Sequence, residues 1–336
     1  MKSITRSLPY AAAALALICA SVAQAEIKRI SIGSNRQGSV FFMLASGFAK
    51  HIQENLKIRS TAQPHAGSSV YLSLVDNGEI TLGLNNSMDT AAAVRGQAPF
   101  RKKLDNVRIL ARVWIIAEGL LVRGDSGIKS LSDLRGKRVV SDVKTLVSMG
   151  IITRHYLASG SVTFDDLVAV KSGGIVKNVN MVIEGRADAA VVGLGMPAVR
   201  KAHATIPGGV RFLPLGPLGT DEYILSAPGM SPYTAKPTKR LPYVTEPLTL
   251  LSIDTYLNAG SAVSNELAYN VVKSLHQNWK KLQKAYGPLR GVKPHQMAPT
   301  NNSAFFHPGA AKYYKEAGIW SAGHDKQAMA ISKQVQ

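Results

Sequence analysis

Cysteine is nearly missing from this sequence, because Cys19 is the single one among 336 residues. One thiol cannot form an intramolecular disulfide, so a disulfide-bonded scaffold is excluded. Cys19 lies in an N-terminal apolar segment, and cleavage of that segment would leave no thiol for catalysis or for a thiolate metal site. Ile18 stands where a lipid-attachment site has a small residue, which disfavours lipidation of Cys19.

Motifs of common enzymes and nucleotide-binding proteins are missing as well. The eight histidines include no His-x-x-x-His or His-Glu-x-x-His pair, so a histidine zinc site has no support. No Gly-x-Ser-x-Gly and no Gly-x-x-x-x-Gly-Lys-Ser/Thr occurs, and the run Ser34 to Ser39 lacks the Gly-x-Gly-x-x-Gly spacing. The adjacent Asp165 and Asp166 are interpreted as an exposed loop. We expect no catalytic residue, no metal and no cofactor, while a catalytic group assembled from distant residues stays open.

Long apolar runs are restricted to the N-terminus. Lys2 and Arg6 precede an apolar segment from Tyr10 to Val22, and Ala23-Gln24-Ala25 then forms a small-x-small cleavage site. The segment is shorter than the roughly 20 residues of a membrane-spanning helix. The sequence therefore predicts a secretory signal peptide over residues 1–25 and a periplasmic location.

Acidic residues are few, since 21 Asp and Glu stand against 40 Lys and Arg, a formal net charge of +19. A surface this basic favours anionic partners. The alternative is a merely solvated basic surface, because the basic residues are scattered along the chain. Nucleic acid is not expected as a partner of an exported protein.

From Glu26 onward, short runs of β-branched residues alternate with segments of helical period, a pattern typical of α/β proteins with parallel strands. The pattern predicts strands over 27–33, 58–62, 80–84, 107–114, 119–122, 138–140, 168–170 and 187–192. It predicts helices over 40–55, 69–77, 130–134, 146–157, 174–184, 265–286 and 308–317. Prolines are frequent over 214–248, which predicts turns, short edge strands and a connection between domains, followed by a helical final third.

Three turns rich in glycine and hydroxyl residues stand where a strand gives way to a helix, at 33–39, 65–69 and 141–145. A helix N-terminus presents unpaired N–H groups and about half a positive charge, so it can hold a carboxylate. The carboxyl ends of parallel strands are also where open α/β sheets bind ligands. The alternative is that these turns only supply ordinary helix N-caps.

Two cations and several aromatic residues lie in or beside these turns. Arg36 and Lys144 could pair with an anion through charge-assisted hydrogen bonds, although a solvated surface charge is the default for either. Four aromatic residues could form a wall of the site, namely Phe41, Phe42, Tyr71 and Trp114. The helical position of Phe41 instead favours a place in the core.

Segments over nearly the whole chain carry a family resemblance. They read ISIGSNRQGSVFFMLASGFAK, AGSSVYLSLVDNGEITLGLNNS, RGDSGIKSLSDLRGKRV, VIEGRADAAVVGLGMPA and HPGAAKYYKEAGIW. The third alone is shared with many periplasmic binding proteins. All five in this order resemble the TAXI-type solute receptors of TRAP transporters.

This resemblance implies a periplasmic-binding-protein fold of type II-like topology, with two lobes that are each a mostly parallel sheet flanked by helices. We expect residues 26–114 and 225–336 to form lobe 1, and residues 115–224 to form lobe 2. The lobes would close around a small carboxylate such as an amino acid or a dicarboxylate. A monomeric receptor would pass this solute to the permease subunits of a TRAP transporter without chemistry.

Carried over position by position, the family's ligand site falls on turns from both lobes. Its residues here are Ser34, Asn35, Arg36, Ser39, Phe41, Gly67, Ser68, Ser69, Asn86, Ser87, Lys144, Thr145, Leu146 and Met196. The first and third turns depart from the family's glycine- and threonine-rich pattern, so a different or bulkier anion stays open. A periplasmic subunit that signals to a membrane regulator and a periplasmic enzyme are the alternative functions.

Overall fold

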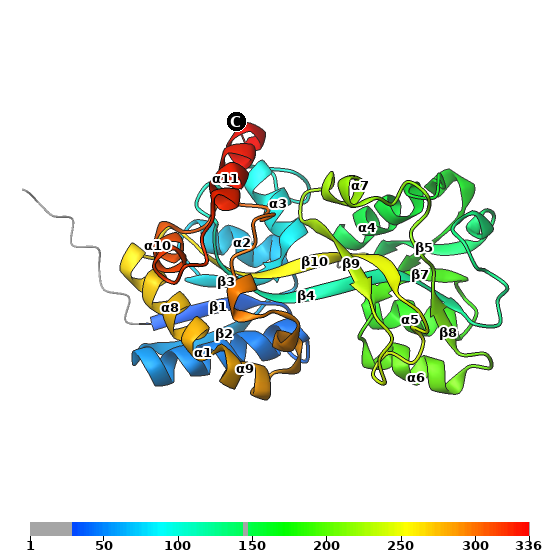
Figure 1. The fold of residues 1–336 in the computed structure, drawn as a ribbon, viewed down its shortest axis with the longest axis horizontal. Helices are drawn as coiled ribbons and strands as arrows, with labels where there is room; N and C mark the ends of the chain where they lie inside the picture. The colour runs from blue at the N-terminus through cyan, green and yellow to red at the C-terminus, as the bar shows by residue number, and fades with distance from the viewer. Residues whose placement is uncertain (1–28, 144–146, 336) are drawn as a thin grey trace, which may run out of the picture.

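A computed structural model describes residues 29–143 and 147–335 of the chain. The predicted signal peptide lies outside these ranges. The described chain forms two lobes side by side (Figure 1). Within the described residues, no helix has both the length and the apolar character needed to cross a bilayer.

One ten-stranded sheet runs through both lobes, in the order β2-β1-β3-β10-β4-β7-β5-β6, with β8 on β4 and β9 on β10. Its strands are β1 (Arg29–Ser34), β2 (Arg59–Pro64), β3 (Leu82–Asn86), β4 (Arg108–Arg123), β5 (Arg138–Val143), β6 (Val168–Ser172), β7 (Ala189–Gly193), β8 (Val210–Phe212), β9 (Met230–Ala235) and β10 (Leu248–Ala259).

Helices flank both halves of this sheet (Figure 1). They are α1 (Val40–Leu56), α2 (Ser68–Asp76), α3 (Ser87–Arg95), α4 (Val147–Ala158), α5 (Ile175–Ile183), α6 (Pro197–Thr205), α7 (Asp221–Leu225), α8 (Asn265–Gln277), α9 (Trp279–Ala285), α10 (Pro308–Glu316) and α11 (Ala322–Val335). Short 3₁₀ helices are η1 (Ser132–Leu134), η2 (Phe164–Asp166), η3 (Gly287–Gly291) and η4 (Pro294–Gln296).

The strand directions in the two lobes are opposite. β1, β2 and β3 are parallel to one another, and so are β5, β6 and β7. Between the two sets, β10 is antiparallel to β3 and to β4, and β4 is antiparallel to β7. The carboxyl ends of the two parallel sets therefore face one another across the middle of the molecule.

Each lobe has its own hydrophobic core, and β4 and β10 contribute to both. The first core holds Phe48 and Trp279, together with Ile109 to Ala111 and Val113 of β4. The second holds Tyr156, together with Leu120 to Val122 of β4. Between these segments, residues 114–117 of β4 are only partly buried. The chain thus leaves one core and enters the other at the centre of β4.

The structure confirms the α/β class and most of the predicted strands and helices, with some differences. The two strands predicted over 107–114 and 119–122 are one strand, β4, because its central residues pair with β10 throughout. The long helix predicted over 265–286 is divided into α8 and α9 at Asn278. β10 and α11, which lie in the third predicted as helical, were not predicted individually.

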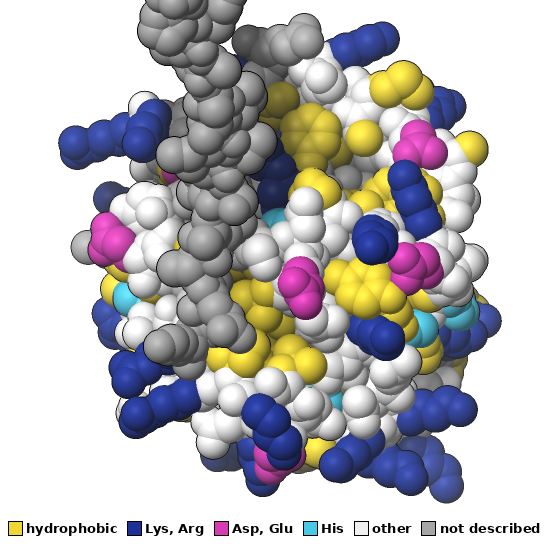
Figure 2. Space-filling view, turned by 90° about the vertical axis from the view of Figure 1, so that its left-hand side faces the viewer, with side chains coloured by type: hydrophobic (Ala, Val, Ile, Leu, Met, Phe, Trp, Pro, Cys, Tyr) yellow, Lys and Arg dark blue, Asp and Glu magenta, His cyan; other side chains and the backbone are white. Residues whose placement is uncertain are grey.

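Basic side chains are spread over the surface and are not gathered in one patch on the face that Figure 2 shows. This view of the lobe on the left of Figure 1 shows Lys and Arg around the whole outline, with few Asp and Glu between them. The face therefore has the scattered charge that the sequence predicts.

Candidate functional site

The carboxyl ends of the strands converge on a short part of β4. At the end of β3, Asn86 lies opposite Thr255 of β10, which in turn lies opposite Trp114. At the end of β7, Gly193 lies opposite Glu118. Trp114 and Glu118 are four residues apart, a distance of about 13 Å along a strand. The turns that follow β3 and β7 therefore meet at the same central stretch of the sheet.

The first predicted turn joins β1 to α1 and contains both engaged and free groups. Ser34 is buried, and its hydroxyl donates to the carbonyl of Asn35 at 3.2 Å. Ser39 caps α1 by accepting from the Phe42 N–H at 3.1 Å, as the N-cap alternative predicted. Arg36 is exposed. The Oδ1 atom of Asn35 is buried without a hydrogen-bond partner among the described residues.

The second turn is held by a buried carboxylate at the start of α3. The Ser68 hydroxyl donates to Asp89, and the side-chain amide of Asn86 donates to the same carboxylate at 2.9 Å. Burial raises the pKa of Asp89, while these two hydrogen bonds act in the opposite direction. Asn86 also caps α3 by accepting from the Asp89 N–H at 2.8 Å. Ser68 and Asn86 are therefore engaged inside lobe 1, while Gly67, which precedes α2, caps that helix without a side chain.

Ser87 joins three segments of the chain. Its hydroxyl donates to the Gly229 carbonyl and accepts from the Asp254 N–H at 3.0 Å. Its carbonyl accepts from the Ser303 hydroxyl at 2.8 Å. These contacts give Ser87 a structural role between the end of β3 and the strand β10.

Of the four aromatic residues, Phe41 and Trp114 form a ring pair with centroids 5.8 Å apart. Both are partly buried against the first core, so the pair lies at the edge of that core. Tyr71 is fully buried, and its hydroxyl donates to the Leu84 carbonyl at 2.7 Å. Tyr71 is thus a core residue and belongs to no wall of the site.

In lobe 2, the described part of the site is the turn after β7. Met196 is the N-cap residue of α6 and is partly buried. A Cβ atom built on Gly193 would lie 3.4 Å from the Met196 Cγ, so this side chain folds back over the end of β7. Lys144, Thr145 and Leu146 lie outside the described residues, as does the side chain of Ser69.

Glu118 is the residue of this region that the sequence analysis missed. Its exposed fraction is 4 %, and its Oε2 atom has no hydrogen-bond partner among the described residues. Burial raises the pKa of Glu118 to about 8. The signal that could have revealed it is that Glu118 is the one charged residue in the apolar run VWIIAEGLLV, from Val113 to Val122.

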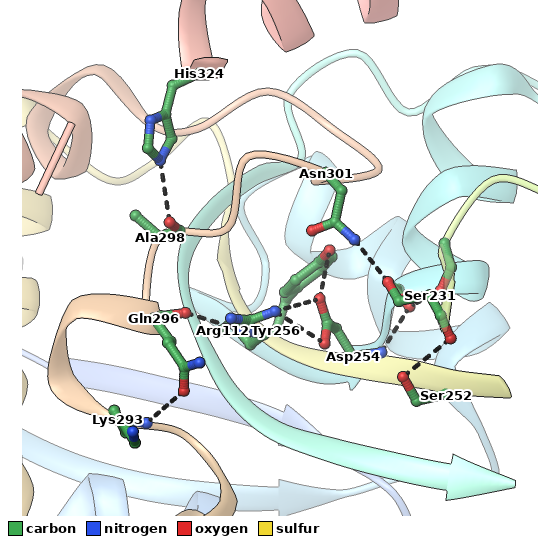
Figure 3. Close-up of polar contacts among 12 residues, drawn as sticks. Arg112, Ser231, Ser252, Asp254, Tyr256, Lys293, Gln296, Ala298, Asn301 and His324 are labelled. Carbon is green, nitrogen blue, oxygen red and sulfur yellow. Dashed lines mark hydrogen bonds and ion pairs between the residues drawn. The ribbon is translucent and has the colours of Figure 1, made fainter. Parts of the chain in front are cut away.

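The other face of the central strands carries a polar network, drawn in Figure 3. Arg112 lies 3.4 Å from the Asp254 carboxylate, and the Tyr256 hydroxyl donates to the same carboxylate at 3.4 Å. Arg112 also donates to the Gln296 carbonyl at 2.9 Å, which ties the segment between α9 and α10 to β4. Asn301 adds a contact to the Ser231 hydroxyl at 2.6 Å (Figure 3). This network fixes the back of the central strands.

Helix N-termini supply the charge of the region. α1, α2 and α3 begin at the carboxyl ends of β1, β2 and β3, and α5 and α6 begin at those of β6 and β7. Each presents unpaired N–H groups and partial positive charge toward the centre of the molecule. No group of three or more His, Cys, Asp or Glu residues that could hold a metal ion occurs in the described ranges. The arrangement suits the binding of an anion.

Comparison with known proteins gives a family and a fold. The model of the NMT1-like family matches residues 32–318. A TctC solute binding protein from Polaromonas is similar in structure, with a TM-score of 0.53 at 15% identity, covering 91% of this chain and 98% of that one. PhnD1 from Prochlorococcus marinus, solved in complex with methylphosphonate, gives 0.52 at 12% identity, covering 88% and 100%. At these identities the two likenesses establish the fold, which is that of solute-binding proteins.

Proposed function

This chain belongs to the NMT1-like family, and from that premise we propose that it is a periplasmic solute-binding protein that captures a small organic anion. One observation carries the proposal. The carboxyl ends of two oppositely directed sets of parallel strands converge on residues 114–118 of β4, with helix N-termini at those ends. An anion held there contacts both lobes, and contacts to both lobes favour a closed arrangement.

The structural neighbours support the same class of function. PhnD1 was solved with methylphosphonate, a small anion, and the Polaromonas protein is a solute binding protein. The basic composition of the chain, with a net charge of +19, also favours an anionic solute.

We extend the proposal to the solute class and the partner from the resemblance to TAXI-type receptors. On that basis the solute is a carboxylate, and the partners are the membrane permease subunits of a TRAP transporter. Residues 1–25 are the export signal. We take the receptor to act as a monomer that releases its solute unchanged.

We propose that the lobes meet at the centres of β4 and β10. Residues 114–117 of β4 lie between the two cores, and in β10 the core changes between Ile253 and Tyr256. This division assigns residues 225–253 to lobe 2, because Met230, Leu250 and Ile253 pack into its core. The sequence had placed them in lobe 1.

Within the site, the groups proposed to contact the solute are those that the fold leaves free. They are the buried Oδ1 atom of Asn35, the exposed guanidinium of Arg36, and the N–H groups that open α1, α2 and α6. Ser68, Asn86 and Ser87 hold the turns in place through their internal hydrogen bonds.

The test is a thermal-shift screen of carboxylates, amino acids and aromatic acids, since a solute that binds the folded state raises its melting temperature. Calorimetry then compares Arg36→Ala with Arg29→Ala, an exposed arginine at the opposite end of β1. Loss of a charged hydrogen bond of roughly 1.5–3 kcal/mol should weaken binding about 10- to 100-fold in Arg36→Ala. Arg29→Ala should bind normally. Equal affinities of the two variants would remove Arg36 from the site.

A further inference from the structure

The position of Glu118 in the sheet places it within the proposed site. It lies opposite Gly193 of β7 and Leu251 of β10, so these three residues share one face of the sheet, together with Ile116. A Cβ atom on Gly193 would lie 3.4 Å from the Met196 Cγ and 3.8 Å from the Ile116 Cγ2. Glu118 is therefore on the face where α6 begins, at the level where the turns of both lobes meet.

The described side chains around Glu118 bring no opposite charge to it. α5 packs on β7 and β4, and its buried Asn178 donates to the Val191 carbonyl of β7 at 3.3 Å, while its Oδ1 atom has no partner in the described part of the chain. Asp254 points to the other face of β10. Its neighbour Ile253 lies opposite Ile116 on the face of Glu118, and successive side chains of a strand point to opposite faces. The cations of α5 and α6, Lys177, Arg200 and Lys201, are exposed. Burial raises the pKa of Glu118.

A buried carboxyl group without a partner is costly, and it needs either an acceptor for its proton or a cation for its charge. Donation of a neutral hydrogen bond does not require a glutamate at position 118, because a glutamine amide would donate equally well. The property that distinguishes the carboxyl is that it can ionise and pair with a cation. Since helix N-termini already suit the anionic part of a solute, the remaining need at Glu118 is for a positive group.

We propose that Glu118 pairs with a protonated amine of the bound solute, so that the solute is a zwitterion of the amino-acid type and not a simple carboxylate. This inference rests on the proposed solute-binding function and narrows its substrate class. The anionic end of the solute is held at the helix N-termini, and the ammonium end reaches the Glu118 Oε2 atom, which has no partner within residues 29–143 and 147–335.

Binding of an ammonium group has a proton signature. At pH 7 the free protein holds a proton on most of its Glu118 side chains, because the pKa is about 8. A cation within hydrogen-bond distance favours the ionised carboxylate, so the proton leaves Glu118 for the buffer as the ion pair forms. A solute without an amine would keep this proton in place, and above pH 8 it would take one up.

The experiment compares amino acids with the same carbon skeletons lacking the amine. The probes are glutamate and glutarate, alanine and propionate, and phenylalanine and 3-phenylpropionate. Thermal shift identifies the members that bind, and calorimetry at pH 7 in phosphate and in Tris measures the protons exchanged. Glu118→Gln keeps the size of the side chain and removes its ionisation.

We expect a binder among the amino acids, with close to one proton released per molecule bound. In Glu118→Gln its affinity should fall at least roughly tenfold and the proton release should vanish. Deaminated analogues that bind as well as the amino acids, or binding with proton uptake, would overturn this inference and leave the anion-binding function standing. If no member of either series raises the melting temperature, the proposed carboxylate-binding function fails, and this inference fails with it.

Discussion

The buried carboxyl of Glu118 should make the stability of the protein depend on pH, and Glu118→Gln isolates that dependence. The pKa of Glu118 is raised from 4.5 to about 8 in the folded protein. A folded-state pKa above the unfolded value means that the folded protein binds more protons between these two values. The free energy of unfolding is therefore not reduced by Glu118 below pH 4.5, where the group is protonated in both states. It falls as the pH rises from 4.5 toward 8.

The size of this loss follows from the two pKa values, 4.5 and about 8. Relative to acid conditions, Glu118 lowers the free energy of unfolding by about 0.8 kcal/mol at pH 5 and by about 3.4 kcal/mol at pH 7. The glutamine variant has no such group. Between pH 5 and pH 7, the wild type should thus lose about 2.5 kcal/mol more stability than Glu118→Gln.

Urea unfolding at pH 5, 6 and 7 measures this difference directly. Buried histidines such as His51 and His307, whose pKa values burial lowers, titrate in both proteins and cancel in the comparison. Glu246→Gln is the matched control, because Glu246 is exposed. If the difference in free energy of unfolding between wild type and Glu118→Gln stays constant across this pH range, Glu118 is not a buried, uncharged carboxyl group.

Three further positions test the packing of lobe 1. Ser39→Ala removes the N-cap of α1 and should cost about 1 kcal/mol in urea unfolding, which Ser39→Asp should largely restore. Gly260→Ala would place a Cβ atom 1.7 Å from the backbone oxygen of Val75, so it should cost about 3 kcal/mol, whereas Gly287→Ala meets nothing within 4 Å and should be neutral. Tyr71→Phe loses a buried hydrogen bond and should cost about 1 kcal/mol without changing solute affinity, and a changed affinity would return Tyr71 to the site.

Local patterns in the sequence were enough to predict the strand, turn and helix units at the N-terminus. In β1 the apolar Ile30 and Ile32 alternate with Ser31 in the sequence, although all three are buried, and in α1 apolar residues recur with the helical period after the N-cap Ser39. β10 is buried from Leu250 to Ala259 between β3 and β4, and its sequence has no regular alternation of apolar and polar residues. A strand of this kind is recognised only when its neighbours are known.

The candidate site likewise has features that local sequence predicts and features that depend on tertiary contacts. The turns at Ser34–Ser39 and Gly67–Ser69 were found because glycine and hydroxyl residues at the start of a helix are local signals. Tyr71 was misjudged as a possible wall, since helical position alone does not tell which neighbour a ring meets. The internal hydrogen bonds of Ser87 could not be predicted from local sequence either, because they join residues more than 140 positions apart.

The sequence by itself determined the α/β class, the turns at the strand ends and the family resemblance, because each depends on residues that are close together in the chain. The tertiary structure alone decided that two oppositely directed sets of strands end against the same part of β4. It also decided that Glu118 is buried there, with no hydrogen-bond partner for its Oε2 atom among the described residues. A single charge in an apolar run singles out Glu118 in the sequence, but its burial and charge environment depend on which distant segments the chain brings together.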